Sequence, residues 1–142
     1  MKFIPYKPEH AKNIFKQGAN GCCDITDEEV DVLSKTAKLS GDSYTALQGG
    51  RIVACGGYEV LEPEIAQAWF LCVNDILPME VKDSKRKFLD IVKGFKRVQT
   101  PLRNDFPTGI KFAEFIGFGF ERIIPKFHTD GTDALMYILG GI

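Results

Sequence analysis

The chain has 142 residues, a formal net charge of −1, 44% hydrophobic residues and 26% charged residues. This length fits one folded domain, 1–142, and the composition is that of a globular protein rather than a disordered one. A nearly neutral chain has no overall field that would draw it to nucleic acid or to a membrane surface. Any recognition of a charged partner must therefore be local.

The sequence carries no visible targeting signal, membrane span or metal-ligand pattern. The opening MKFIPYKPEH lacks the apolar core of a signal peptide, and no apolar run approaches the roughly 20 residues that span a bilayer. The cysteines Cys22, Cys23, Cys55 and Cys72 form neither a metal-ligand spacing nor a disulfide framework. We expect a protein of the reducing cytoplasm, without membrane association and without a metal.

Strand and helix signals alternate along the first half of the chain. Pro8 suits the first turn of a helix, and Thr26 with Glu29 has the spacing of a capping box. Gly49 and Gly50 predict a hairpin, because glycine adopts the positive φ of tight turns. The predicted elements are a strand at 3–6, helices at 8–19 and 26–37, and strands at 44–47 and 52–58.

The second half of the chain centres on the apolar run AWFLCV, which is typical of a strand buried on both faces. Asp83 or Ser84 is a suitable cap for the helix that follows, and Gly117 ends a later, shorter helix. The predicted elements are a strand at 65–73, a helix from 83 or 84 to 95, a strand at 98–102, a helix at 108–116, and strands at 118–124 and 134–139. Antiparallel strands that lead into a buried central strand indicate a mixed sheet.

Two segments and the order of the elements resemble the GNAT superfamily of N-acetyltransferases. FIPYKPEHAKNIF is similar to the usual start of these proteins, and FPTGIKFAEFIGFGFERI is similar to their fourth helix and following strand. The resemblance implies an α/β (α+β) protein with a mixed central sheet flanked by about four helices. It also implies that strand 65–73 lies beside strand 98–102 and splays from it.

A narrower resemblance is to small phage proteins of this fold, including internal virion proteins of short-tailed phages. The segments that carry it are AWF at 68–70, KDSKRKF at 82–88 and GIKFAEFIG at 109–117. This resemblance implies a protein that uses the fold for virion assembly or host interaction. A phage protein or a second copy of the chain would then be the partner.

The GNAT resemblance implies a binding site for acetyl-CoA at the start of the helix after the buried strand. The family's R/Q-x-x-G-x-G/A loop corresponds here to 81–87, which lacks both glycines. Local basic charge compensates for them, although a solvated helix face explains the same residues. The residues assigned to the diphosphate are Lys82, Asp83, Ser84, Lys85 and Arg86.

The remaining cofactor-binding and catalytic positions also follow from the resemblance. The backbone of Leu71, Cys72 and Val73 would pair with the pantetheine arm. Asn104 lies near the family's asparagine position, although an ungapped match places Phe106 there. The tyrosine that protonates the leaving thiolate in the family corresponds to Ala113, which has no acidic hydrogen.

Glu59, on the strand before the buried one, is the carboxylate best placed to act as a general base. An exposed strand carboxylate is the alternative interpretation. The function that follows is acetyl transfer from acetyl-CoA to an amine, either a small molecule or a protein lysine. A non-catalytic phage protein is the alternative function, and nucleic-acid binding ranks last because basic residues cluster only between Lys82 and Arg97.

Overall fold

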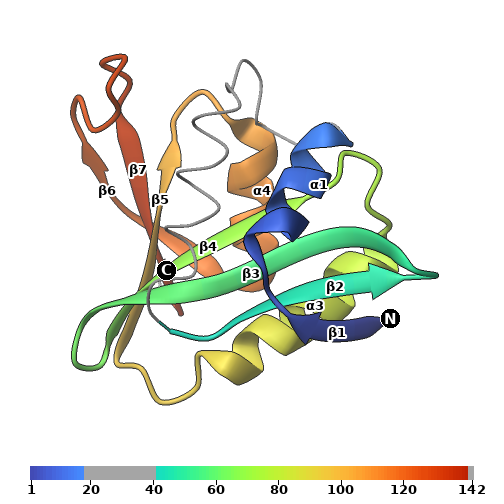
Figure 1. The fold of residues 1–142 in the computed structure, drawn as a ribbon. Coiled ribbons are helices and arrows are strands. Elements are labelled where there is room, and N and C mark those ends of the chain that lie inside the picture. Colours follow the sequence, from blue (N-terminus) through green and yellow to red (C-terminus); the bar gives the residue numbers. More distant parts are fainter. Residues whose placement is uncertain (18–40, 141–142) are drawn as a thin grey trace.

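The computed structural model describes residues 1–17 and 41–140, and their elements follow the predicted order (Figure 1). The predicted helix 26–37, together with Cys22 and Cys23, lies outside the described residues. The elements are β1 (Lys2–Pro5), α1 (Pro8–Lys16), β2 (Ser43–Gln48), β3 (Arg51–Glu62), β4 (Ile65–Cys72), α3 (Pro78–Ile91), β5 (Arg97–Arg103), α4 (Pro107–Ile116), β6 (Phe118–Ile124) and β7 (Ala134–Leu139).

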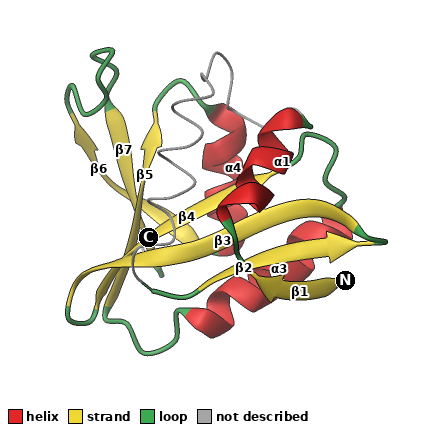
Figure 2. Cartoon of the chain, in the orientation of Figure 1, coloured by secondary structure: helices red, strands yellow, loops and turns green. Residues whose placement is uncertain are grey.

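The strands form one seven-stranded sheet in the order β1-β2-β3-β4-β5-β7-β6 (Figure 2). Neighbouring strands are antiparallel except β4 and β5, which are parallel. The helix α3 connects this parallel pair, as is usual for a crossover between parallel strands. The predicted mixed sheet with flanking helices is confirmed, and three of the roughly four expected helices fall among the described residues.

The parallel strands β4 and β5 pair only at their beginnings and then diverge. The register joins Ile65 to Arg97, Ala66 to Val98 and Gln67 to Gln99, and the ladder stops there. Beyond this point β4 stays paired with β3 and β5 stays paired with β7. Pro101, which lacks an N–H, therefore removes no hydrogen bond to β4. The predicted splay between the two strands is confirmed.

Strand alternation gives the sheet two packed faces. On one face, Phe88 of α3 and Ile116 of α4 pack against strand residues such as Tyr44. On the other face, Ile14 of α1 packs against Val53 and its neighbours. The two faces of the sheet around β3 and β4 are thus covered by different helices, with the splayed strands between them.

One glycine is required by the packing of the α3 face. A Cβ at Gly56 of β3 would lie 2.7 Å from Oη of Tyr44 and 2.9 Å from Cδ2 of Phe70. Such approaches are shorter than van der Waals contact, so any larger residue here displaces one of the two rings. The Tyr44 hydroxyl instead reaches across to α3, where it donates a hydrogen bond to the carbonyl of Ser84 over 3.3 Å.

The start of α3 differs from the sequence prediction by five residues or more. The helix begins at Pro78, not at Asp83 or Ser84. Proline is favourable at the first helical position, and the carboxylate of Glu80 accepts a hydrogen bond from the Leu77 N–H over 2.9 Å. This upstream start places the assigned diphosphate residues within the helix rather than at its N-terminus.

Candidate functional site

A cavity of about 600 Å³ lies where β4 and β5 separate, and its wall is largely apolar. The strand β4 supplies Gln67 to Cys72, β5 supplies Thr100 to Leu102, and α4 supplies much of the floor. Thr108 and Lys111 add polar groups from α4. Among the residues that line the cavity, no carboxylate occurs. This is the chemistry of a site for an uncharged, mostly apolar chain.

The backbone of β4 offers alternate residues to the cavity. Val73 N–H donates to the Val53 carbonyl of β3 over 3.0 Å, so this amide is not available to a ligand. Because strand amides alternate in direction, the amide of Leu71 also faces β3, whereas that of Phe70 faces β5. The Val73 amide predicted to pair with the pantetheine is thus already paired within the sheet. Leu71 and Cys72 do line the cavity.

The basic residues of α3 do not gather at one site. Lys85 lies over the ring of Phe115 on α4, with Nζ 4.9 Å from the ring centroid. Asp83 and Arg86 line a separate hollow beside Phe3 of β1. Lys82 is exposed in the second turn of the helix. The residues assigned to a diphosphate are thus spread along the first half of α3 rather than gathered at its first residue.

Ser84 is fully buried and faces the sheet. Its carbonyl accepts the hydrogen bond from Tyr44, and its hydroxyl has no hydrogen-bond partner among the described residues. A side chain in this position cannot reach a ligand at the helix N-terminus. The position that resembled a cap is thus an inward-facing position of the second turn of α3.

The true N-terminus of α3 is poorly suited to an anion. Pro78 has no N–H to donate, and the Leu77 N–H is already occupied by the Glu80 carboxylate. Asp75 in the preceding loop adds a second carboxylate, which lies 2.6 Å from Arg51. The hydrogen bond from Arg51 lowers the pKa of Asp75, so this carboxyl stays charged. Negative charge here opposes the binding of a phosphate group.

Two lysines are associated with the helix α4 that forms the floor of the cavity, Lys111 of α4 itself and Lys85 of α3. Lys111 lines the cavity directly, and Phe115, under the Lys85 ammonium, lies four residues further along α4. Lys111 and Phe115 are spaced by four, so they lie on the same face of α4, and the Lys85 ammonium lies over the Phe115 ring on that face. Sequence reasoning did not find Lys111, because a single lysine in an apolar helix gave no signal of its own.

The α4 side of the cavity is aromatic and lacks an acid. Phe112 packs against Phe70 of β4, with ring centroids 4.3 Å apart. Ala113, at the family's tyrosine position, lines the cavity, and no tyrosine does so among the described residues. Asn104 is exposed outside the cavity, where Phe106 lines the wall instead. The prediction of Asn104 as a ligand group is thus not supported by its position.

Glu59 lies on β3 directly opposite Gln67 in the register. Tyr58 packs on the α3 face, so alternation places Glu59 and Gln67 on the α1 face. Glu59 has no hydrogen-bond or ion-pair partner among the described residues, and it does not line the cavity itself. Its neighbour Gln67 does line the cavity. The carboxylate is thus one strand away from the point where β4 and β5 separate.

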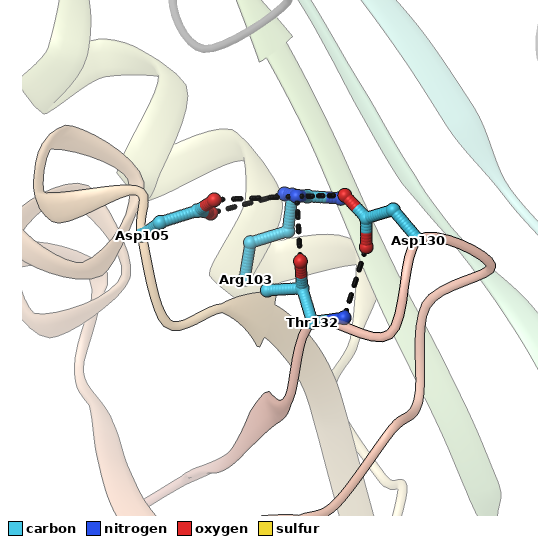
Figure 3. Close-up of polar contacts among 4 residues, drawn as sticks. All are labelled: Arg103, Asp105, Asp130 and Thr132. Carbon is cyan, nitrogen blue, oxygen red and sulfur yellow. Dashed lines mark hydrogen bonds and ion pairs between the residues drawn. The ribbon is translucent and has the colours of Figure 1, made fainter.

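An ion-pair network fixes the loops beyond the open end of β5 (Figure 3). Arg103 pairs with Asp105 over 3.0 Å and with Asp130 over 2.7 Å, and it donates to the Thr132 hydroxyl over 3.1 Å. Hydrogen bonds from Thr132 and Arg103 hold the pKa of Asp130 well below its usual range. The network joins the loop before α4 to the β6–β7 loop, next to the cavity residue Leu102.

None of the helices in the described part of the chain is long and apolar enough to cross a membrane. The same residues contain no group of three or more His, Cys, Asp or Glu side chains placed to hold a metal ion.

No family model matches the sequence, and no curated protein matches it. Solved structures do match. An IAA acetyltransferase from Bacillus cereus is 13% identical, with a TM-score of 0.70 and 97% of each chain covered. A spermidine N-acetyltransferase mutant from Vibrio cholerae is 9% identical, with a TM-score of 0.71 over 98% of this chain and 94% of that chain.

A GNAT family acetyltransferase from Elizabethkingia anophelis, with acetyl-CoA bound, is 17% identical, with a TM-score of 0.65 over 82% of this chain and 84% of that chain. The similarity to these three structures spans between 82% and 98% of this chain. At these identities the similarity concerns the backbone. The chain has the fold of the GNAT acetyltransferases.

Proposed function

We propose that this protein binds the acyl-pantetheine arm of acetyl-CoA between β4 and β5 and transfers the acetyl group to an amine. The observation that carries the proposal is the apolar cavity of about 600 Å³ between the separated strands. A largely apolar pocket with a few convergent polar groups is the usual form of a small-molecule site. A structural neighbour with this fold has acetyl-CoA bound.

The reaction is a direct transfer. The amine nitrogen forms a bond to the acetyl carbonyl carbon, the carbon–sulfur bond breaks, and the thiolate leaves with the electron pair. Glu59 accepts the proton that the amine loses, since it has no ion-pair partner among the described residues and lies opposite the cavity residue Gln67 on the α1 face. Water protonates the thiolate, because Ala113 supplies no acid. We therefore expect slow turnover.

Lys85 and Lys111 bind the phosphate groups in this proposal. The N-terminus of α3 lacks the glycine loop and carries Asp75 and Glu80, so the helix dipole offers little to an anion. Lys111 lines the cavity and Lys85 lies over Phe115 of the same helix α4, and neither lysine is paired with a carboxylate among the described residues. Phosphate binding at two exposed ammonium groups is expected to weaken steeply with salt.

The alternative is a non-catalytic protein that keeps the fold for assembly, as in the phage proteins that some segments resemble. The observation in its favour is the loss of two functional elements together: the phosphate-binding turn and the phenol at position 113. In this alternative the cavity holds no thioester, and the surface of the fold binds another protein.

Calorimetric titration with acetyl-CoA separates the two functions. We expect measurable binding that weakens with salt, and weaker binding in Lys85→Ala and Lys111→Ala. Lys93→Ala is the matched control, since Lys93 is a lysine of the same region that pairs with Asp90 over 3.6 Å, away from the cavity. No binding at millimolar acetyl-CoA, or equal weakening in all three variants, contradicts the proposed site.

A further inference from the structure

A row of hydrogen-bonded side chains crosses the α1 face of the sheet and ends at the cavity. Glu121 of β6 holds Arg97 of β5 through two hydrogen bonds of 2.6 Å each. Arg97 Nε donates to Gln99 Oε1 over 2.8 Å, and Gln99 Nε2 donates to Gln67 Oε1 over 3.3 Å. Gln67 sits at the last pair of the β4–β5 ladder and lines the cavity.

The row fixes which way each amide points. A guanidinium only donates, so the Gln99 atom that faces Arg97 must be its oxygen. The amide nitrogen of Gln99 then faces Gln67, and the atom that accepts its hydrogen bond must be the Gln67 oxygen. The Gln67 nitrogen is left over as a donor, and no acceptor for it occurs among the described residues. The orientation depends on Glu121, whose two oxygens hold the guanidinium in place.

The carboxylate of Glu59, which accepts hydrogen bonds, is a neighbour of the Gln67 amide nitrogen, which donates them. Glu59 is directly opposite Gln67 on the paired strand β3, and residues paired in this way have Cβ atoms about 5 Å apart. Both side chains lie on the α1 face, where alternation places them beside the point of separation. One small molecule can therefore meet a carboxylate and an amide N–H at the same time.

We propose that Gln67 determines specificity for an acceptor that carries a carbonyl oxygen next to its amino group, as in an α-amino amide or a peptide N-terminus. The ammonium or amine lies against Glu59, and the carbonyl oxygen two bonds from the nitrogen-bearing carbon accepts the hydrogen bond from Gln67 Nε2. This inference rests on the proposed function, which makes the α1 face the side from which the amine approaches.

A plain polyamine fits the same place less well. Each ammonium group of a polyamine requires an anionic partner or water, and Glu59 is the carboxylate that this place supplies among the described residues. The amide N–H of Gln67 has nothing to donate to on a saturated carbon chain. A donor left without an acceptor in a partly buried site disfavours the ligand that fails to pair with it.

Binding is measured directly through Trp69, which lines the cavity and is the one tryptophan of the 142-residue chain. Fluorescence titration compares alaninamide with 2-amino-3-methylbutane, in which two methyl groups replace the carbonyl oxygen and amide nitrogen. We expect the wild type to prefer alaninamide by about 5-fold, the factor of one net hydrogen bond. In Gln67→Leu the preference is lost, because affinity for alaninamide falls and affinity for the hydrocarbon analogue does not.

Gln99→Leu tests the row, since it leaves Gln67 in place but frees its amide to rotate. We expect Gln99→Leu to reduce the roughly 5-fold preference for alaninamide without abolishing it. The control variant Gln48→Leu, at an exposed position of β2, is expected to keep the full preference. The inference is overturned if the wild type has no preference, binds neither amine, or keeps its preference in Gln67→Leu. If the preference follows Gln67 but no acetyl group is transferred, the proposed function fails, and Gln67 is shown to select the carbonyl-bearing amine as a ligand only.

Discussion

Replacing Ala113 by tyrosine tests whether a missing acid limits acetyl transfer. Ala113 lines the cavity and is 6% exposed as a residue. A phenol here extends into a cavity of about 600 Å³ rather than into packed core, so we expect little loss of folding stability. General acid catalysis contributes roughly 10²–10⁴ in rate, and a phenol introduced without further adjustment is expected to reach the lower end.

Ala113→Phe is the matched control for this change. It adds the same ring without the hydroxyl, so any effect of filling the cavity appears equally in both variants. The assay follows release of the CoA thiol at saturating acetyl-CoA with an amine in excess, after thermal melts show that both variants are folded. We expect kcat of Ala113→Tyr to exceed that of Ala113→Phe by about 10²-fold. Equal rates in the two variants refute the reasoning, because they show that protonation of the thiolate does not limit turnover.

Three further predictions follow from other parts of the structure. Glu59→Gln is expected to lower the transfer rate most near neutral pH while the calorimetric affinity for acetyl-CoA stays unchanged; an unchanged rate excludes Glu59 as the base. Gly56→Ala should destabilise the fold by about 1–3 kcal/mol in urea unfolding, since the new Cβ meets the Tyr44 hydroxyl at 2.7 Å; a neutral change contradicts the packing. Arg103→Ala should lower the Tm slightly near pH 7. The pKa of Asp130 is lowered in the folded protein, so its ion pair stabilises the fold at pH values above 3.8, the usual pKa of an aspartate, and this stabilisation is lost as Asp130 is protonated at lower pH. The difference in Tm between wild type and Arg103→Ala should therefore shrink as the pH falls below 3.8. A difference in Tm that does not change with pH contradicts the ion pairs as its cause.

Most of the fold was predictable because each element carries its own local signal. The alternation of β2 and β3 around Gly49 and Gly50, and the end of α4 at Gly117, are local features, and the structure has them where the sequence predicted them. The start of α3 was misplaced because two start signals compete within six residues. Pro78 with Glu80 is the effective one, and Ser84, which reads as a cap, is an inward-facing residue.

The candidate site was less predictable because its parts meet only through the register of the sheet. The row of hydrogen-bonded side chains is formed by residues of separate strands, which include Gln67, Gln99 and Glu121. Their spacing along the chain does not predict that these side chains meet. Lys111 becomes relevant only because α4 forms the floor of the cavity. The resemblance did identify the separated strands, since they follow from element order.

The separation of β4 and β5 also bears on how the protein avoids self-association. A strand that leaves its partner exposes a row of backbone donors and acceptors, and such an edge normally invites pairing with another chain. Here the two unpaired edges face each other across a cavity whose walls include Phe88 of α3 and Phe112 of α4. The unpaired backbone groups are thus inside the sheet, whose outer edges are β1 and β6. The separation leaves hydrogen-bonding groups free without adding another outer edge to the sheet.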